Sequence, residues 1–247
     1  MGHRPSSLRL VPGEQSSSLP VLGRRIVRCR RCPRLVEWRE QAAARPPRRF
    51  EGDQYWARPL PGFGDPAARL IVIGLAPAAH GGNRTGRVFT GDRSGDWLYA
   101  SLHRAGFANQ ARSERRGDGL RLRAAYVTAV NRCPPPGNRP TPAERDNCLP
   151  YLVEELRLLE RAKVLVALGS FAWEGALRAL RGLEQEIPRP KPRFGHGAEA
   201  PIGGYVLVGC YHPSQQNTFT GRLTEAMLDD LFARARELAD GQRSSKR

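Results

Sequence analysis

Four short apolar runs, separated by longer stretches with helical patterning, constrain the fold of this 247-residue chain more than any other feature. They cover residues 70–75, 125–130, 163–168 and 205–210, and they are typical of strands buried between two layers. Helical patterns lie near residues 34–44, 97–105, 143–160, 171–180 and 224–239. This alternation predicts an α/β fold, a three-layer α/β/α sandwich around a central, mainly parallel four-stranded sheet.

The length suits one α/β domain with loose ends, or at most two small domains. We expect a flexible arm over residues 1–20, which are rich in Ser, Pro and Arg, a single domain over 21–240, and a flexible tail over 241–247. The helix near 143–160 has a clear start, because Thr141 precedes Pro142 and Glu144 follows three positions on. The segment 189–204, rich in Pro and Gly, is expected to be a loop.

The balance of charge favours a polyanionic partner. Lys and Arg number 40 against 24 Asp and Glu, a formal net charge of +16. The codon bias of a GC-rich genome explains why Arg outnumbers Lys, but it does not explain the excess of basic over acidic residues. No apolar stretch reaches the roughly 18–20 residues of a membrane span, and no secretory signal is visible, so we expect a cytoplasmic protein.

The first apolar run opens into a long loop, residues 74–97, which contains six glycines. Glycines let the backbone approach a ligand closely and adopt positive φ. The loop also carries the ring of Phe89, the carboxylate of Asp92, the imidazole of His80, and the guanidinium groups of Arg84 and Arg87. Because open α/β folds bind ligands at the carboxyl ends of their strands, this loop predicts a site for a flat, anion-linked group such as a nucleotide.

The last apolar run leads into a second polar loop, residues 211–222, which is expected at the same edge of the sheet. A lone histidine is more often structural than catalytic. His212, however, is followed by Pro213 at a strand end and lies among hydroxyls and amides without apolar periodicity, which favours a catalytic role. The residues suited to phosphate and groove contacts are Ser214, Gln216, Asn217 and Arg222.

A third loop, residues 131–140, follows the second run and is stiffened by four prolines. Its Asn138 is either a functional amide or part of an ordinary Gly-Asn turn, and the local pattern favours neither interpretation.

Five cysteines are present, and four of them suggest a metal site. Cys29 and Cys32 form a C-x2-C pair among arginines, whereas Cys133 and Cys148 are separated by fourteen residues. Because the second pair is spread out, the pattern is at least as compatible with a [4Fe–4S] cluster as with zinc. The alternative is a set of small buried hydrophobic residues, which is the role we expect for Cys210 at the end of an apolar run.

Together these segments resemble the uracil-DNA glycosylase superfamily, and within it the type B (family five) iron–sulfur branch. The resemblance spans residues 25–240 and rests on five motifs: RCRRCPRLVEWRE (28–40), YWARPLPGFGD (55–65), GLAPAAHGGNRTGRVFTGD (74–92), NRCPPPGNRPTPAE (131–144) and YHPSQQNTFTGRLT (211–224). It implies an enzyme that flips a damaged base out of DNA and hydrolyses its N-glycosidic bond.

The resemblance assigns roles to residues of this chain. It implies that Asp92, Asn138 and His212 are catalytic, and that Phe89 and Ala129 lie at the flipped base. We expect His80, from its place in the glycine-rich loop, to contact the base as well. The resemblance makes Cys29, Cys32, Cys133 and Cys148 the ligands of a [4Fe–4S] cluster. From their residue types and loops, we expect Arg87, Ser214, Gln216, Asn217 and Arg222 to contact the DNA.

Two departures from related families affect the expected substrate range. Leu75 stands where sister families carry an acidic or amide residue, so Asp92 is expected to activate the water. Ala129 stands where strict uracil enzymes have an asparagine, which implies that hypoxanthine and xanthine are accepted beside uracil. No lysine lies in the three loops, so we expect a monofunctional glycosylase that leaves an intact abasic site.

Two other functions compete with this interpretation. A non-catalytic, metal-containing DNA-binding module is the main alternative, although a binder alone has no need of Phe89, Asp92 and His212 together. A nucleotide hydrolase is disfavoured because the glycine-rich loop lacks the P-loop lysine. We therefore expect a monomeric enzyme, associated with the bacterial nucleoid, that acts on DNA containing deaminated bases and uses no nucleotide cofactor.

Overall fold

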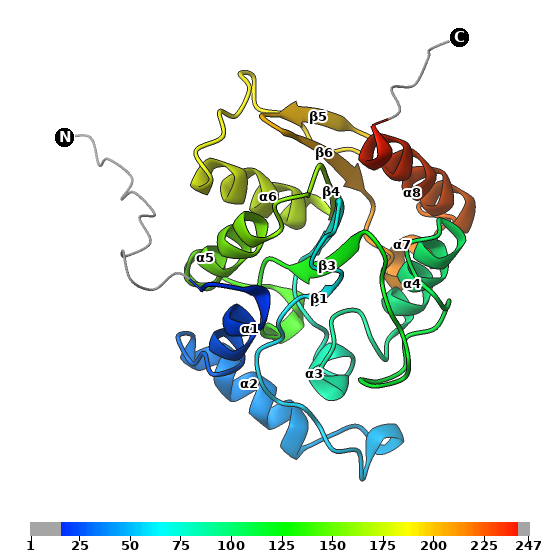
Figure 1. Ribbon diagram of the computed structural model, residues 1–247. Helices are drawn as coiled ribbons and strands as arrows, with labels where there is room; N and C mark the ends of the chain where they lie inside the picture. The colour runs from blue at the N-terminus through cyan, green and yellow to red at the C-terminus, as the bar shows by residue number, and fades with distance from the viewer. Residues whose placement is uncertain (1–15, 242–247) are drawn as a thin grey trace, which may run out of the picture.

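A six-stranded sheet forms the centre of the described residues, 16–241 of the computed structural model (Figure 1). The strand order is β1-β3-β2-β4-β6-β5. The four central strands are parallel: β2 (Leu70–Gly74), β3 (Ala125–Ala129), β4 (Val164–Leu168) and β6 (Tyr205–Cys210). These four are the predicted strands, so the α/β class and the parallel core of the sheet are confirmed.

Two short antiparallel strands extend the sheet beyond the predicted four. β1 (Phe63–Gly64) pairs with β3 at one edge, and β5 (Glu199–Ile202) pairs with β6 at the other. The expected loop over residues 189–204 was therefore only partly right. Pro201 lies inside β5, and proline is tolerated there because an edge strand needs ladder hydrogen bonds on one side alone.

Eight α-helices and two short 3-10 helices surround the sheet within the described residues. They are α1 (Leu19–Val27), α2 (Pro33–Ala44), α3 (Gly82–Thr85), α4 (Arg93–Arg104), α5 (Pro142–Leu158), α6 (Ser170–Gly182), α7 (Gln215–Phe219) and α8 (Glu225–Asp240), with η1 (Arg48–Phe50) and η2 (Pro136–Asn138). Of these, α1, α3 and α7 were not expected from the sequence, because each is short or lies within a loop pattern.

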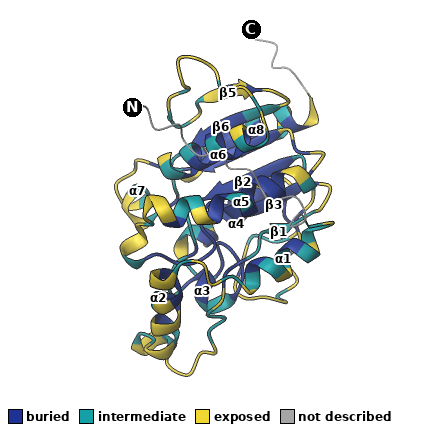
Figure 2. Ribbon diagram, turned by 90° about the vertical axis from the view of Figure 1, so that its left-hand side faces the viewer, coloured by how far each residue is buried: buried dark blue, intermediate teal, exposed yellow. Residues whose placement is uncertain are grey.

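Alternate residues of each buried strand serve the two faces of the sheet. Ile71 and Ile73 of β2 pack in one apolar cluster with Leu152 of α5 and Trp173 of α6. Val72 packs in the other cluster, which contains side chains of α4 and α8. The strands are accordingly buried on both sides, and the three-layer arrangement is confirmed (Figure 2).

Local sequence signals explain where two important helices begin. α5 starts with a full capping box, in which the backbone N–H of Glu144 donates to Thr141 Oγ1 (3.2 Å) and the N–H of Thr141 donates to Glu144 Oε2 (2.7 Å). α4 starts at Arg93, four residues before the expected position, because Asp92 accepts a hydrogen bond from the N–H of Gly95 and caps the helix.

The predicted boundaries of the domain lie close to the ends of the described chain. α1 begins at Leu19, so the last two residues of the expected arm are helical, while residues 1–15 lie outside the described residues. Gly241 ends α8 in a left-handed conformation, and residues 242–247 likewise lie outside. None of the helices in the described part has the length and apolar character needed to cross a membrane.

Candidate active site

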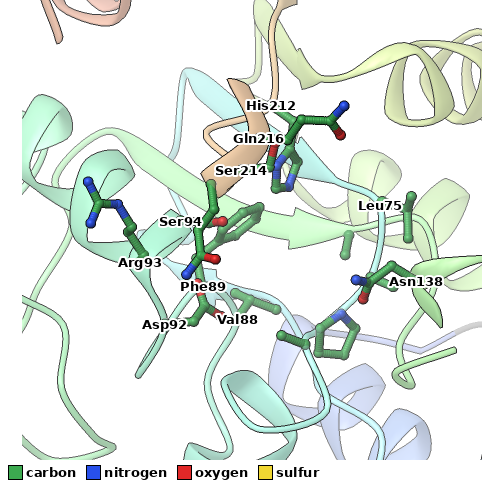
Figure 3. A pocket seen from close by; sticks show the side chains of 15 residues that line it. Leu75, Val88, Phe89, Asp92, Arg93, Ser94, Asn138, His212, Ser214 and Gln216 are labelled. Carbon is green, nitrogen blue, oxygen red and sulfur yellow. The ribbon is translucent and has the colours of Figure 1, made fainter. Parts of the chain in front are cut away.

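A cavity of about 520 Å³ lies at the carboxyl edge of the sheet (Figure 3). The loops after β2, β3 and β6 enclose it, because the parallel strands all end at this edge. Seven of the residues predicted for the site line it: Phe89, Asp92, Ala129, Asn138, His212, Ser214 and Gln216. Leu75, Val88, Arg93 and Ser94 also line it, and none of them was expected from the sequence to be a contact.

Asp92 combines a structural contact with a carboxyl group that faces the cavity. Its Oδ1 accepts the N–H of Gly95 at 3.0 Å, which caps α4. Burial raises the pKa of this carboxyl, and the backbone N–H groups of Gly95 and Ser94 partly oppose the rise. The group is therefore an easier proton acceptor than an exposed aspartate, while the helix start holds it in place.

Glycines keep the two central side chains of the site in position. A Cβ on Gly81 would lie 2.1 Å from Asp92 Oδ2, and a Cβ on Gly74 would lie 2.6 Å from the Cζ atom of Phe89. Both side chains thus rest directly against a glycine backbone. Phe89 itself has a positive φ of 51°, which is unusual for a side chain with a ring and turns it toward the cavity.

His212 lies across the cavity from Asp92, and its ring faces that of Phe89 with centroids 5.9 Å apart (Figure 3). Its ring nitrogens have no hydrogen-bond partner among residues 16–241. Burial removes the water that would solvate an imidazolium, and this lowers the pKa of His212 to about 4. The imidazole is therefore neutral at pH 7, and it keeps its N–H free for a ligand.

The lowered pKa of His212 ties stability to pH. In the unfolded chain an imidazole titrates near 6.5, so between about pH 6.5 and 4 the unfolded state binds a proton that the folded state does not. This contribution to the free energy of unfolding is fully present above pH 6.5 and is lost as the pH falls, by up to about 3 kcal/mol. We expect His212→Asn to reduce the loss of stability between pH 7 and 4.5 in urea unfolding. Exposed His103→Asn controls for removal of an imidazole, and identical pH slopes in the wild type and His212→Asn would contradict the prediction.

The loop after His212 is held by its own side chains. Asn217 Nδ2 donates to the carbonyl of His212 (2.8 Å), and Ser214 Oγ accepts the N–H of Asn217 at the start of α7. Arg222 stacks on the ring of Tyr211 at 4.6 Å, and His196 stacks on the same ring at 5.1 Å. Asn217 and Arg222, predicted as DNA contacts, thus have an internal structural role in this arrangement.

Besides Asn217 and Arg222, two further predicted site residues, Arg87 and His80, do not line the cavity. Arg87 is buried, and its guanidinium forms a two-point ion pair with Asp118, with a further hydrogen bond to Ser113. It is not exposed to a DNA phosphate. His80 does not line the cavity, and its Nδ1 is 2.9 Å from the hydroxyl of Tyr55. A polar residue in a ligand loop faces either the ligand or the scaffold, and the sequence does not distinguish the two.

Four cysteines gather beside the loop that carries Asn138. The Cys133 thiol interacts electrostatically with those of Cys29 and Cys32, and the Cys148 thiol interacts with those of Cys29 and Cys133. Burial raises the pKa of Cys133 to about 11 and that of Cys148 to about 12. Cys210 lies in the apolar core, as expected.

Hydrogen-bond donors are directed at these sulfur atoms. Arg39 Nη1 lies 3.1 Å from Cys133 Sγ, and the backbone N–H of Arg132 donates to Cys148 Sγ at 3.2 Å. Asn147 Nδ2 lies 3.7 Å from Cys32 Sγ. Within residues 16–241 no three His, Cys, Asp or Glu side chains converge closely enough to hold a single metal ion.

The family model and the most similar proteins point to the same family. A family model described as the uracil DNA glycosylase superfamily matches residues 61–236. The chain is 57% identical over 213 residues to a type-5 uracil-DNA glycosylase of Mycobacterium tuberculosis, covering 85% of this chain and 78% of the relative. It is 54% identical over 226 residues to that of Mycobacterium leprae (91% and 97% covered), and 52% identical over 212 residues to that of Thermus thermophilus (85% and 94%).

Proposed function

Because the chain belongs to the uracil-DNA glycosylase superfamily, we propose that it excises uracil from DNA by hydrolysis of the N-glycosidic bond, in base excision repair. It is then a glycosylase-type hydrolase whose substrate is DNA containing uracil. The observation that carries this proposal is the meeting of an aromatic ring, a neutral imidazole and an enclosed carboxylate in one cavity.

Each of these groups suits one requirement of the reaction. The ring of Phe89 offers a stacking surface for a flipped base, which offsets part of the few kcal/mol that unstacking costs. When the glycosidic bond breaks, the base leaves with the bonding electron pair, and negative charge develops on its carbonyl oxygen. The neutral His212 donates a hydrogen bond to that oxygen, in a site where the donor is already positioned.

Asp92 acts on the sugar side of the same bond. Its carboxylate stabilises the positive charge that develops on the sugar and orients a water molecule toward the anomeric carbon. As the new C–O bond forms, the water passes a proton to the carboxylate, which the raised pKa of Asp92 favours. Asn138 borders the same cavity and is placed to share this water or to donate to the base.

The lining of the cavity supports a monofunctional and rather permissive enzyme. None of the residues that line it is a lysine, so no amine is present to form a Schiff base with the sugar. Ala129 contributes only a methyl group at the cavity, where it cannot read the hydrogen-bonding edge of a base. We therefore include hypoxanthine and xanthine among the proposed substrates.

The four gathered thiols fit a [4Fe–4S] cluster. A cluster takes one thiolate at each iron corner, so its ligands are spaced more widely than those of a single ion. The N–H groups of Arg39 and Arg132 that donate to Cys133 and Cys148 would compensate the negative charge that bound thiolates carry. Cys29, Cys32, Cys133 and Cys148 would hold it, and it would cross-link the N-terminal helices to the loop that presents Asn138.

Cys133→Ser is expected to lower both stability and activity, because it removes one corner of this cross-link next to the loop of Asn138. We expect loss of bound iron and of its visible absorbance, together with a lower melting temperature. Cys210→Ala, a buried thiol on β6, is the matched control and should retain its iron. Full iron content and unchanged melting of Cys133→Ser would refute the ligand assignment.

Gly81→Ala tests whether the position of the Asp92 carboxyl matters. The new Cβ would overlap Asp92 Oδ2, so the carboxyl must move. A displacement of about 1 Å costs on the order of 100-fold in rate, and we expect a loss of that size in single-turnover excision. Gly204→Ala is the control, because a Cβ there meets nothing within 4 Å. A Gly81→Ala enzyme with the wild-type rate would show that Asp92 tolerates displacement.

The function itself is tested with end-labelled oligonucleotides that carry one uracil, hypoxanthine or xanthine, incubated in the presence of EDTA. We expect strand cleavage at the lesion only after alkali, which identifies an intact abasic product and ranks the three bases. Iron-loaded protein that binds these oligonucleotides and cleaves none of them would instead support a non-catalytic DNA-binding module.

A further inference from the structure

A second cavity, of about 500 Å³, lies beside the cysteines and is lined mainly by arginines. Arg24, Arg25, Arg28, Arg30 and Arg31 form most of its wall, together with Val21, Cys29 and Tyr151. We call it the arginine cavity. It is built from the end of α1, the segment before α2, and one side chain of α5. It is separate from the 520 Å³ cavity lined by Phe89, Asp92 and His212, which we call the base cavity.

Much of the positive charge in the arginine cavity has no acidic partner. Arg25 pairs with Glu154, and Arg30 pairs with Glu40. Arg24, Arg28 and Arg31 are exposed and form no ion pair within residues 16–241.

An aromatic ring holds part of this charge in place. The guanidinium of Arg31 lies 5.5 Å from the centre of the Tyr151 ring, as does that of Arg25. Tyr151 is buried and packs with Leu22 and Ile26 of α1, so its ring is held against the body of the protein. Like charges gathered around a fixed concave surface repel one another, and a bound anion removes that repulsion.

We propose that the arginine cavity binds backbone phosphates of the DNA substrate, outside the segment that enters the base cavity. This inference rests on the proposed function, because it takes DNA as the ligand. Phosphodiester oxygens match the paired N–H donors of guanidinium groups. The cavity borders Cys29, whose thiol neighbours that of Cys133, and Cys133 lies in the loop 131–140 that also presents Asn138 to the base cavity. One length of DNA backbone would thus follow the cysteine region away from the lesion.

The triple variant Arg24→Gln/Arg28→Gln/Arg31→Gln tests the proposal through the salt dependence of binding. Each phosphate neutralised on duplex DNA contributes about 0.9 to the slope of log K against log salt concentration. With a duplex that contains a non-cleavable abasic analogue, we expect the slope to fall by about 2 to 3. At low salt we expect the affinity to fall by at least tenfold.

The control removes the same charge from the opposite edge of the sheet. Arg161, Lys163 and Arg181 are exposed, form no ion pair within residues 16–241, and lie between α5 and β4 and near the end of α6, where the strands begin. Their triple Gln variant should keep the wild-type slope. Equal slopes for the wild type and the Arg24/Arg28/Arg31 variant, or an equal loss in both triple variants, would overturn the proposal.

Two further arms separate this proposal from others. Titration with inorganic phosphate that detects binding to the wild type only, with no difference in DNA slope, would assign the cavity to a free anion and overturn the DNA assignment. Excision from a five-nucleotide single strand needs only the base cavity, so the triple variant should match the wild type there. Absence of excision by the wild type itself would count against the proposed function, while the salt slopes would still test the arginine cavity.

Discussion

Asp92→Asn is expected to slow excision by orders of magnitude while the protein remains folded and able to bind DNA. Asparagine caps a helix as well as aspartate does, so the hydrogen bond from Gly95 and the start of α4 are retained. The substitution removes only the charge and the proton acceptor. Loss of a positioned acid or base costs about 10²–10⁴-fold, and we expect a loss in this range in single-turnover excision, with a melting temperature close to that of the wild type.

Asp92→Ala is a less informative variant, because it also removes the helix cap, which is worth about 1 kcal/mol. Asp96→Asn provides the matched control: Asp96 lies in the first turn of the same helix but does not line the cavity. It should excise uracil at close to the wild-type rate. An Asp92→Asn enzyme with wild-type turnover would remove this carboxylate from the mechanism.

The raised pKa of Asp92 also predicts the pH dependence of the reaction. In the mechanism that we propose, the reaction needs the ionised carboxylate, so we expect the rate to fall as the pH drops through the pKa of this group. Because burial raises that pKa, the acid limb of the rate profile should lie above the usual value of 3.8. His212 stays neutral down to about pH 4, so its titration does not cause this fall in rate. The residual activity of His212→Asn should therefore fall over the same pH range as that of the wild type. A rate that is flat down to pH 4 would contradict this assignment.

The parallel core of the fold was predictable because its signals are local and redundant. The β2 run is apolar on both faces and is followed by a helix pattern, and the same holds for β3 and β4. The edge strands were not predictable. β1 has only two residues, and the Pro201 of β5 argues against a strand, so their pairing depends on the neighbours that the fold supplies.

The site could be predicted to the level of the loop but not of every side chain. Strand ends locate Asp92 and His212, since topology alone brings those loops together. The direction of a polar side chain depends on partners far away in the sequence. Arg87 turns inward because Asp118 completes its ion pair, and Arg222 lies over Tyr211. No periodicity in the sequence reports such contacts.

The buried pair of Arg132 and Glu155 should be the most destabilising place to remove a single charge. Both side chains are about 1% exposed, and Arg132 Nη2 lies 2.6 Å from Glu155 Oε2. Glu155 also accepts hydrogen bonds from Thr128 and Tyr126 of β3, while Arg132 donates from its backbone to Cys148. The pair therefore ties the end of β3 to α5 beside the cysteines.

Arg132→Met leaves the Glu155 carboxylate buried without its counter-charge, and we expect a loss of about 3–5 kcal/mol in the free energy of unfolding. The double variant Arg132→Met/Glu155→Leu removes both charges, so it should be more stable than Arg132→Met alone. Urea unfolding of the two single variants and the double variant gives the coupling energy directly.

An exposed pair provides the contrast. Lys191 is exposed and Glu174 is partly exposed, so Lys191→Met should change the stability by less than about 1 kcal/mol. If Arg132→Met cost no more than this control, or if the double variant lost the sum of both single effects, the two buried charges would not depend on each other for stability. If instead the double variant recovers stability but excises uracil more slowly, the pair serves to position the loop of Asn138 at the base cavity and not to stabilise the fold.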